Sequence, residues 1–221
     1  MSIVLIHVDP TTLGDTHLSG PHCIIDDWVS LKQVGFSCVD AALPNPGAPN
    51  QVFFFFQDRY VLVEVCSPPG ARDDKLIDGP KNTLIEFANL QGPQFGTPDV
   101  TLQVARPADN GYYWVYFFKN TKWLQFSVGE VLGGAKDIGD YWKSLKKVGF
   151  KTMDMAMDTR FTSSVGVSMR GYGIRLVSHR HAAQRHPLTL SPLKGKANDE
   201  VKSGPYDTGN LWPTLREAGF Y

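Results

Sequence analysis

The sequence lacks an excess of charge of either sign. Its 221 residues include 22 lysines and arginines against 22 aspartates and glutamates, so the formal net charge is zero at pH 7. A balanced chain sets up no long-range field that would attract nucleic acid or an anionic membrane surface. We therefore expect no nucleic acid and no membrane among its partners.

Cysteines are few, and long apolar runs are missing. The three cysteines, Cys23, Cys38 and Cys66, cannot all pair within one chain, and they form no Cys-x-x-Cys motif. The apolar run at 3–6 is shorter than the core of a secretory signal, and no basic residue precedes it. Reduced thiols and the lack of a visible signal predict a cytoplasmic protein.

Motifs of catalysis are also missing. The sequence contains no nucleophile elbow, no zinc-binding helix motif and no phosphate-binding loop. The pattern Gly171-Tyr172-Gly173 is too short to hold a phosphate and predicts a turn. We therefore predict that the protein is not an enzyme.

The sequence does contain a repeat. The segments Trp28–Phe36 and Trp142–Phe150 match at every position but two, a third copy lies at Trp212–Phe220, and a weaker one begins at Phe87. A glycine stands eight residues before each of these four anchors. Repetition of this kind predicts similar structural units. We expect four of them, approximately 1–36, 37–92, 93–150 and 151–221, within a single domain over 1–221.

Each unit combines strands with one short helix. Ile24, Trp28 and Leu31 recur at helical spacing, and a glycine after the helix can cap its C-terminus. Aromatic and β-branched residues dominate the segments that follow, and the residues at 57–59 between two such segments predict a hairpin. The sequence therefore predicts an all-β protein with short helices.

An aspartate opens the first strand of three units. Asp40, Asp99 and Asp154 each lie four residues after the phenylalanine that ends the preceding segment. Small antiparallel sheets repeated around an axis avoid long exposed edges, although a stacked solenoid would also explain repeats.

With these features the sequence resembles the hemopexin repeat, in which each blade begins with an aspartate and small residues, continues into an aromatic hairpin and ends in a helix. The matching stretches are Val39–Ala42, Phe53–Phe56 and Tyr60–Leu62, and Pro69–Gly79 resembles the hemopexin-fold seed albumins and lectins of legumes. The resemblance implies a four-bladed hemopexin-type β-propeller whose first strands line a short channel.

The resemblance also implies a cation in that channel, calcium or sodium. Residue by residue, the matching positions are Asp40, Asp99 and Asp154. Backbone carbonyls assisted by carboxylates suit such a hard cation. The alternative is structural, because an aspartate at the start of a strand can accept hydrogen bonds from nearby backbone N–H groups and fix a turn.

The first unit departs from the family pattern. The segment at 3–8 aligns with the outer strand at 60–65, so the first blade lacks its inner strands, and no aspartate follows Phe220. Three explanations are open: a truncated sequence, a sheet completed by another chain, and a reduced blade in which 3–8 moves inward. The second predicts a homodimer that covers an exposed strand edge, and the third predicts a monomer.

Two groups of side chains are candidates for ligand binding. They are His179, His181 and His186 in the lengthened last unit, and Tyr112, Tyr113 and Trp114 after a turn. The histidines can bind a transition metal or haem iron, and the alternative is a solvated loop. The aromatic rings can stack on a sugar or hold a polyamine, and the alternative is core packing.

The resemblance gives two competing functions. The first is a non-enzymatic protein that binds a cation together with a small ligand, either a polyamine or haem. The second is a lectin that binds glycans. Both rest on analogy of fold, which does not by itself determine function.

Overall fold

The computed structural model describes residues 2–8, 15–48, 50–65, 73–105, 113–127, 130–131, 133–159, 164–169, 172–178, 199–207, 210 and 213–217. In these residues the chain forms four antiparallel sheets accompanied by short helices. The predicted class, mainly β with short helices, is confirmed.

The strands follow the chain from one sheet to the next. The first sheet contains β1 (Ser2–Val8) and β2 (Asp15–Cys23), and the second contains β3 (Ala41–Pro44), β4 (Gln51–Phe56), β5 (Arg59–Glu64) and β6 (Lys75–Asn82). The third contains β7 (Val100–Ala105), β8 (Tyr113–Lys119), β9 (Lys122–Ser127), β10 (Glu130–Val131) and β11 (Lys136–Asp137). The fourth contains β12 (Met155–Thr159), β13 (Ser164–Met169), β14 (Tyr172–Ser178) and β15 (Asp199–Asp207).

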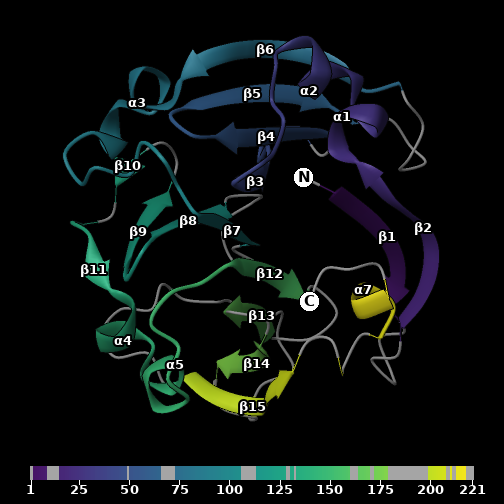
Figure 1. Cartoon of the computed structure of the whole chain (residues 1–221). Coiled ribbons are helices and arrows are strands. Elements are labelled where there is room, and N and C mark those ends of the chain that lie inside the picture. Colours follow the sequence, from purple (N-terminus) through teal and green to yellow (C-terminus); the bar gives the residue numbers. More distant parts are fainter. Residues whose placement is uncertain are drawn as a thin grey trace, which may run out of the picture.

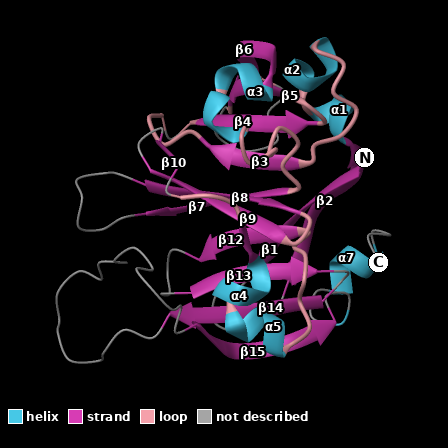
Figure 2. Cartoon of the chain, turned by 90° about the vertical axis from the view of Figure 1, so that its left-hand side faces the viewer, coloured by secondary structure: helices cyan, strands magenta, loops and turns pink. Residues whose placement is uncertain are grey.

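Short helices follow the last strand of each sheet. They are α1 (Ile24–Asp27), α2 (Val29–Gln33), α3 (Thr83–Glu86), the 3-10 helix η1 (Ala88–Leu90), α4 (Ile138–Tyr141), α5 (Lys143–Lys147) and α7 (Pro213–Glu217). Figure 1 shows the four sheets set around a common centre, with β3, β7 and β12 nearest to it. The side view in Figure 2 shows the strands of successive sheets crossing the molecule, with α3, α4 and α5 on the side that faces the viewer.

Two-residue turns join the central strands of the second and third sheets. The last pairs before the turns are Phe56 with Arg59 and Lys119 with Lys122. Gln57 and Asn120, the first turn residues, have φ angles of 56° and 52°. Positive φ at the first turn residue suits a tight antiparallel connection. The hairpin predicted at 57–59 is confirmed, and the third sheet repeats it at 120–121.

The register identifies the strands of the first sheet. Pairing between β1 and β2 shifts twice, between Ile3 and Leu5 and between Leu5 and Ile6, and two such shifts recur between β5 and β6 and between β14 and β15. The strands β2 and β6 each contain a cis Gly-Pro peptide bond. By register, β1 therefore corresponds to β5 and not to β3. This agrees with the predicted alignment of residues 3–8 with residues 60–65.

The core lies between neighbouring sheets. Phe55 packs with Phe117 of the third sheet, and their ring centroids are 6.0 Å apart. Phe54, on the opposite face of the same strand, packs with Leu31 and Trp28 of the first repeat segment. Both faces of β4 are covered, which explains its run of four phenylalanines. Each fully buried ring of this kind contributes roughly 1.5–3 kcal/mol.

Each repeat segment ends in the same backbone bond. The N–H of Phe36, Phe95 and Phe150 donates to the carbonyl five residues earlier, at 2.9, 3.0 and 2.8 Å. The residue before each phenylalanine has positive φ, at Gly35, Gln94 and Gly149. This left-handed residue ends the helix, as predicted for the glycines.

The helices connect each sheet to the next one. Helix α2 contacts β6, η1 contacts β10, α5 contacts β15, and α7 contacts β2 of the first sheet. Asp74 strengthens the first of these contacts, because its carboxylate accepts from the N–H groups of Val29 and Ser30 at 2.9 and 2.7 Å. The inner strands contact one another as well, β3 with β7 and β7 with β12.

Candidate functional site

The inner strands bring equivalent positions of three repeats toward the centre of the molecule (Figure 1). Two residues after each aspartate stands a small side chain: Ala42, Thr101 and Ala156. The hydroxyl of Thr101 donates to the backbone carbonyl of Ala42 at 2.7 Å and so joins β7 to β3. These matching positions near the centre make this region the candidate site.

Two of the three aspartates hold the hairpin turns. The carboxylate of Asp40 accepts from the N–H of Gln57 at 2.6 Å, and that of Asp99 accepts from the N–H of Asn120 at 2.6 Å. Their own N–H groups donate to Phe55 and Phe118 at 2.8 and 2.9 Å. These bonds match the structural alternative, in which the aspartate fixes a turn.

A cation would have to be bound mainly by the backbone here. Within the described ranges, no group of three or more His, Cys, Asp and Glu side chains lies close enough together to hold a metal ion. Asp154 is exposed at the start of β12, and one carboxylate oxygen of Asp40 and of Asp99 is already engaged. A cation at the inner strands would therefore take backbone carbonyl oxygens as its main ligands. Ligation by the side chains of the three aspartates remains a prediction.

The other candidate residues divide into two groups. His179, His181, His186 and Tyr112 lie outside the described residues. Tyr113 is half-buried at the start of β8, and Trp114 is 2% exposed inside the core. Core packing therefore applies at Trp114, whose ring is not available to stack on a sugar. Both faces of β8 are covered, and the Trp114 side chain lies in the core of the third sheet. A binding role for Tyr112 and Tyr113 stays a prediction.

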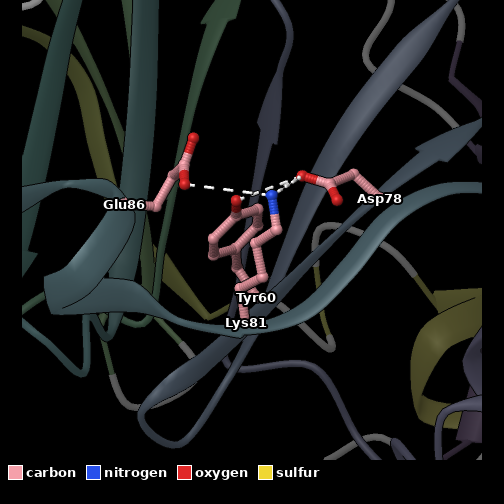
Figure 3. A network of polar contacts seen from close by, with 4 residues as sticks. All are labelled: Tyr60, Asp78, Lys81 and Glu86. Carbon is pink, nitrogen blue, oxygen red and sulfur yellow. Dashed lines mark hydrogen bonds and ion pairs between the residues drawn. The ribbon is translucent and has the colours of Figure 1, made fainter.

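Sequence reasoning missed a polar network on the second sheet, shown in Figure 3. The hydroxyl of Tyr60 donates to Oδ2 of Asp78 at 3.4 Å, and Lys81 donates to the same oxygen at 2.6 Å. Oε2 of Glu86 lies 3.9 Å from the Lys81 ammonium. Strands β5 and β6 and helix α3 position these four side chains.

Charge and burial set the protonation states of this network. The hydrogen bond from Lys81 lowers the pKa of Asp78 and in turn raises that of Lys81. Burial, followed by the charges of Glu86 and Asp78, raises the pKa of the Tyr60 phenol. At neutral pH Asp78 is therefore a carboxylate, Lys81 is an ammonium and Tyr60 is a protonated phenol that acts as a donor.

A repeat-level comparison could have revealed the position of Lys81. Lys81 and Lys136 both stand two residues after the glycine of their repeat, at Gly79 and Gly134. Their partners could not be read from the sequence. The shifts in pairing between β5 and β6 decide which side chains face each other.

The fold defines a class: a chain of antiparallel sheets with the hemopexin fold of plant seed albumins. No established family model matches the sequence. A hemopexin fold protein, CP4, from cow pea has a TM-score of 0.76 and 20% identity over 97% of this chain and 88% of its own. A plant lectin with two metal binding sites from Cicer arietinum has a TM-score of 0.76 and 23% identity over 98% and 88% of the two chains.

The sequence is also similar to Albumin-2 of Pisum sativum. The two are 24% identical over 214 residues, which cover 96% of this chain and 85% of the relative. The predicted resemblance to hemopexin-fold seed albumins is thus confirmed at the level of fold. Within the residues that the structure describes, no helix has the length and apolar character needed to cross a membrane.

Proposed function

We propose that the protein is a non-enzymatic binding protein that holds a hard cation, calcium or sodium, at the centre of a closed four-bladed hemopexin-type propeller. One observation carries the proposal: three equivalent inner strands lie around a common centre, each preceded by an aspartate with a small residue two positions after it. Their backbone carbonyls are oxygen ligands of the kind that hard cations prefer.

Contacts between the ends of the chain support a closed ring. Helix α7 contacts β2, as α2 contacts β6 and α5 contacts β15. The last described helix thus makes with the first sheet the contact that each earlier helix makes with the next sheet. A ring of small sheets needs no long unprotected edge, which is the physical advantage of a propeller.

The second part of the proposal is a small ligand, a polyamine or haem. The metal-binding lectin from Cicer arietinum supports a cation site in this fold. His179, His181 and His186 are the side chains in this chain that would ligate haem iron. The alternative function is a lectin, and the same structural neighbour supports it because it is described as one.

Calorimetry separates these functions. The protein is stripped with a chelator and titrated with calcium, sodium, spermine and haem in turn, and a glycan array is probed in parallel. Saturable calcium or sodium binding supports the axial site, and silence with both ions overturns it. Binding to glycans without binding of spermine or haem would replace the small-ligand proposal with the lectin.

We also propose a cytoplasmic homodimer. In the described part of the chain β1 pairs with β2 alone, so its other edge presents backbone groups that another strand can bind. Cys23 and Cys38 are free thiols, which suits a reducing compartment. Light scattering tests the dimer, and a strict monomer at micromolar concentration would overturn it.

A further inference from the structure

Strand pairing in the second sheet shows which backbone groups of β3 face the centre. Along an antiparallel pair, alternate residues turn their N–H and C=O groups toward the partner strand, and the residues between them turn these groups away. The carbonyl of Phe55 accepts from the N–H of Asp40, so Phe55 turns toward β3, where its direct partner is Ala41. Ala42, the next residue, therefore turns its C=O away from β4 and toward the inner edge of the sheet.

The third sheet repeats this arrangement. The carbonyl of Phe118 accepts from the N–H of Asp99, so Phe118 turns toward β7, where its direct partner is Val100. Thr101, the next residue, therefore turns its C=O toward the inner edge of β7. The strands β3 and β7 contact each other near the centre (Figure 1), so their inward carbonyls belong to one region.

The fourth sheet adds an equivalent carbonyl. Ser168 stands one residue before the last pair of β13 with β14, as Phe55 and Phe118 stand one residue before the last pairs of their hairpins. Ser168 therefore turns toward β12 and its direct partner Met155, and Ala156 turns its C=O to the inner edge. Strand β12 contacts β7, so the three inner strands each direct a carbonyl toward the centre at this level.

One of these positions also carries a side-chain oxygen. Thr101 donates its hydroxyl proton to the carbonyl of Ala42 at 2.7 Å, whereas the equivalent residues of β3 and β12 are alanines. A hydroxyl has one proton to donate and two lone pairs that accept. Because the proton already has an acceptor, the Thr101 oxygen can offer its lone pairs to a cation without leaving a donor unsatisfied.

The spacing and burial of these two oxygens suit an ion. Calcium takes about six to eight oxygen ligands at about 2.3–2.6 Å, so neighbouring ligands of one ion lie close together. A separation of 2.7 Å between Thr101 Oγ1 and the Ala42 carbonyl oxygen allows both to belong to one shell of ligands. Ala42 is exposed, whereas Thr101 is only 6% exposed. An ion can therefore arrive from solvent at Ala42 and meet a hydroxyl that is shielded from water.

We propose that the Thr101 hydroxyl oxygen is a ligand of the central cation, next to the backbone carbonyls of Ala42, Thr101 and Ala156. This ligand role rests on the cation site proposed above and assigns residues to it. The alternative is structural: the hydroxyl joins β7 to β3, and its loss changes stability without changing ion affinity.

Two substitutions at Thr101 separate these roles. Thr101→Val keeps the shape of the side chain and removes its oxygen, whereas Thr101→Ser keeps the oxygen. The chelator-stripped protein is titrated calorimetrically with calcium chloride and, separately, with sodium chloride. Loss of an outer partner of a metal ligand already costs about 10–100-fold in affinity, so Thr101→Val should bind the ion at least about tenfold more weakly than the parent. Thr101→Ser should bind nearly as the parent does.

Thr83 provides the matched control. It is a fully buried threonine at the start of α3, and its Oγ1 has no hydrogen-bond partner within the described part of the chain. Thr83→Val removes the same atom away from the inner strands and should leave ion affinity unchanged. Thermal melts establish that each variant is folded before it is titrated.

A measurement on the parent covers the case in which Thr101→Val does not fold. The methyl resonance of Thr101, assigned by its absence in Thr101→Ser, should shift as the ion saturates the protein, while that of Thr83 stays in place. An unmoved Thr101 methyl at saturation, or equal affinity of Thr101→Val and the parent, would overturn the ligand role and leave the central cation in place. Silence of the parent with both ions overturns the central cation itself, and the ligand role with it.

Discussion

The second and third sheets share a backbone and differ in the side chains on its outer part. Both have a two-residue hairpin held by an aspartate, and in both the helix ends in the same backbone bond. At the shared lysine position the second sheet supplies carboxylates, and the third supplies aromatic rings. The repeat therefore conserves the bonds that shape the chain, and individual chemistry is added at the periphery.

The largest expected difference concerns the anchors of the two repeat segments. Trp142 is buried among Tyr116, Phe118 and Trp123, whereas Phe87 is half-buried. Trp142→Ala should lower the free energy of unfolding by about 3–5 kcal/mol, and Phe87→Ala should lower it less. Urea unfolding followed by circular dichroism measures both, and equal losses would show that the two segments bury the same surface.

The aspartates at the hairpin turns come next. Asp40→Ala and Asp99→Ala each remove the acceptor for a turn N–H, and each should cost about 1 kcal/mol of stability. Asp40→Asn and Asp99→Asn keep an acceptor oxygen and should cost less. A role of these side chains in ion binding would appear separately, as weaker calcium or sodium affinity in calorimetry of the same four variants.

The left-handed residue before the phenylalanine is a glutamine in one repeat and a glycine in the other. Gln94 has φ of 63° where Gly149 has 82°, and a side chain is strained in this conformation. Gln94→Gly should stabilise the protein by up to about 1 kcal/mol, and Gly149→Ala should destabilise it by a similar amount. No atom lies within 4 Å of a Cβ at Gly149, so the backbone alone determines the effect. Thermal melts of the two variants should shift in opposite directions.

The smallest effect is a difference in acid sensitivity. The hydrogen bond from Lys81 lowers the folded-state pKa of Asp78, so this contribution to stability is present above the unfolded pKa and is lost as pH falls through the folded value. Lys81→Met should raise the pKa of Asp78 and flatten the acid limb of a stability profile. Lys136→Met should leave that limb unchanged, because no carboxylate in the described part of the chain pairs with Lys136. Carboxyl NMR titration of Asp78 checks the first expectation.

Local patterns predicted the repeats, the hairpins and the left-handed glycines. Turn chemistry and helix ends depend on a few neighbouring residues, so these features can be read from the sequence. The burial of Trp114 could not be read, because it depends on other elements that cover both faces of β8. The position of Asp40 was predicted, whereas its bond to Gln57 became visible only with the turn in place.

The partners of the two lysines illustrate the same limit. Equivalent positions in the repeats carry Lys81 and Lys136, yet one meets carboxylates and the other meets rings. Lys81 meets Asp78 of the strand and Glu86 of α3. Lys136 meets Trp123 of the strand and Tyr141 of α4, and tertiary packing brings each set together. Repeat alignment locates such a position, and the structure assigns its neighbours.

The contact of α7 with β2 has a consequence for folding kinetics. It joins residues from opposite ends of the chain, whereas the contacts of α2 with β6 and of α5 with β15 join segments much closer in sequence. Closing a longer loop costs more chain entropy, and contacts of high sequence separation slow folding. The sheets should therefore form first as separate hairpins. Docking of α7 on β2 should come last and limit the rate at which the complete molecule appears.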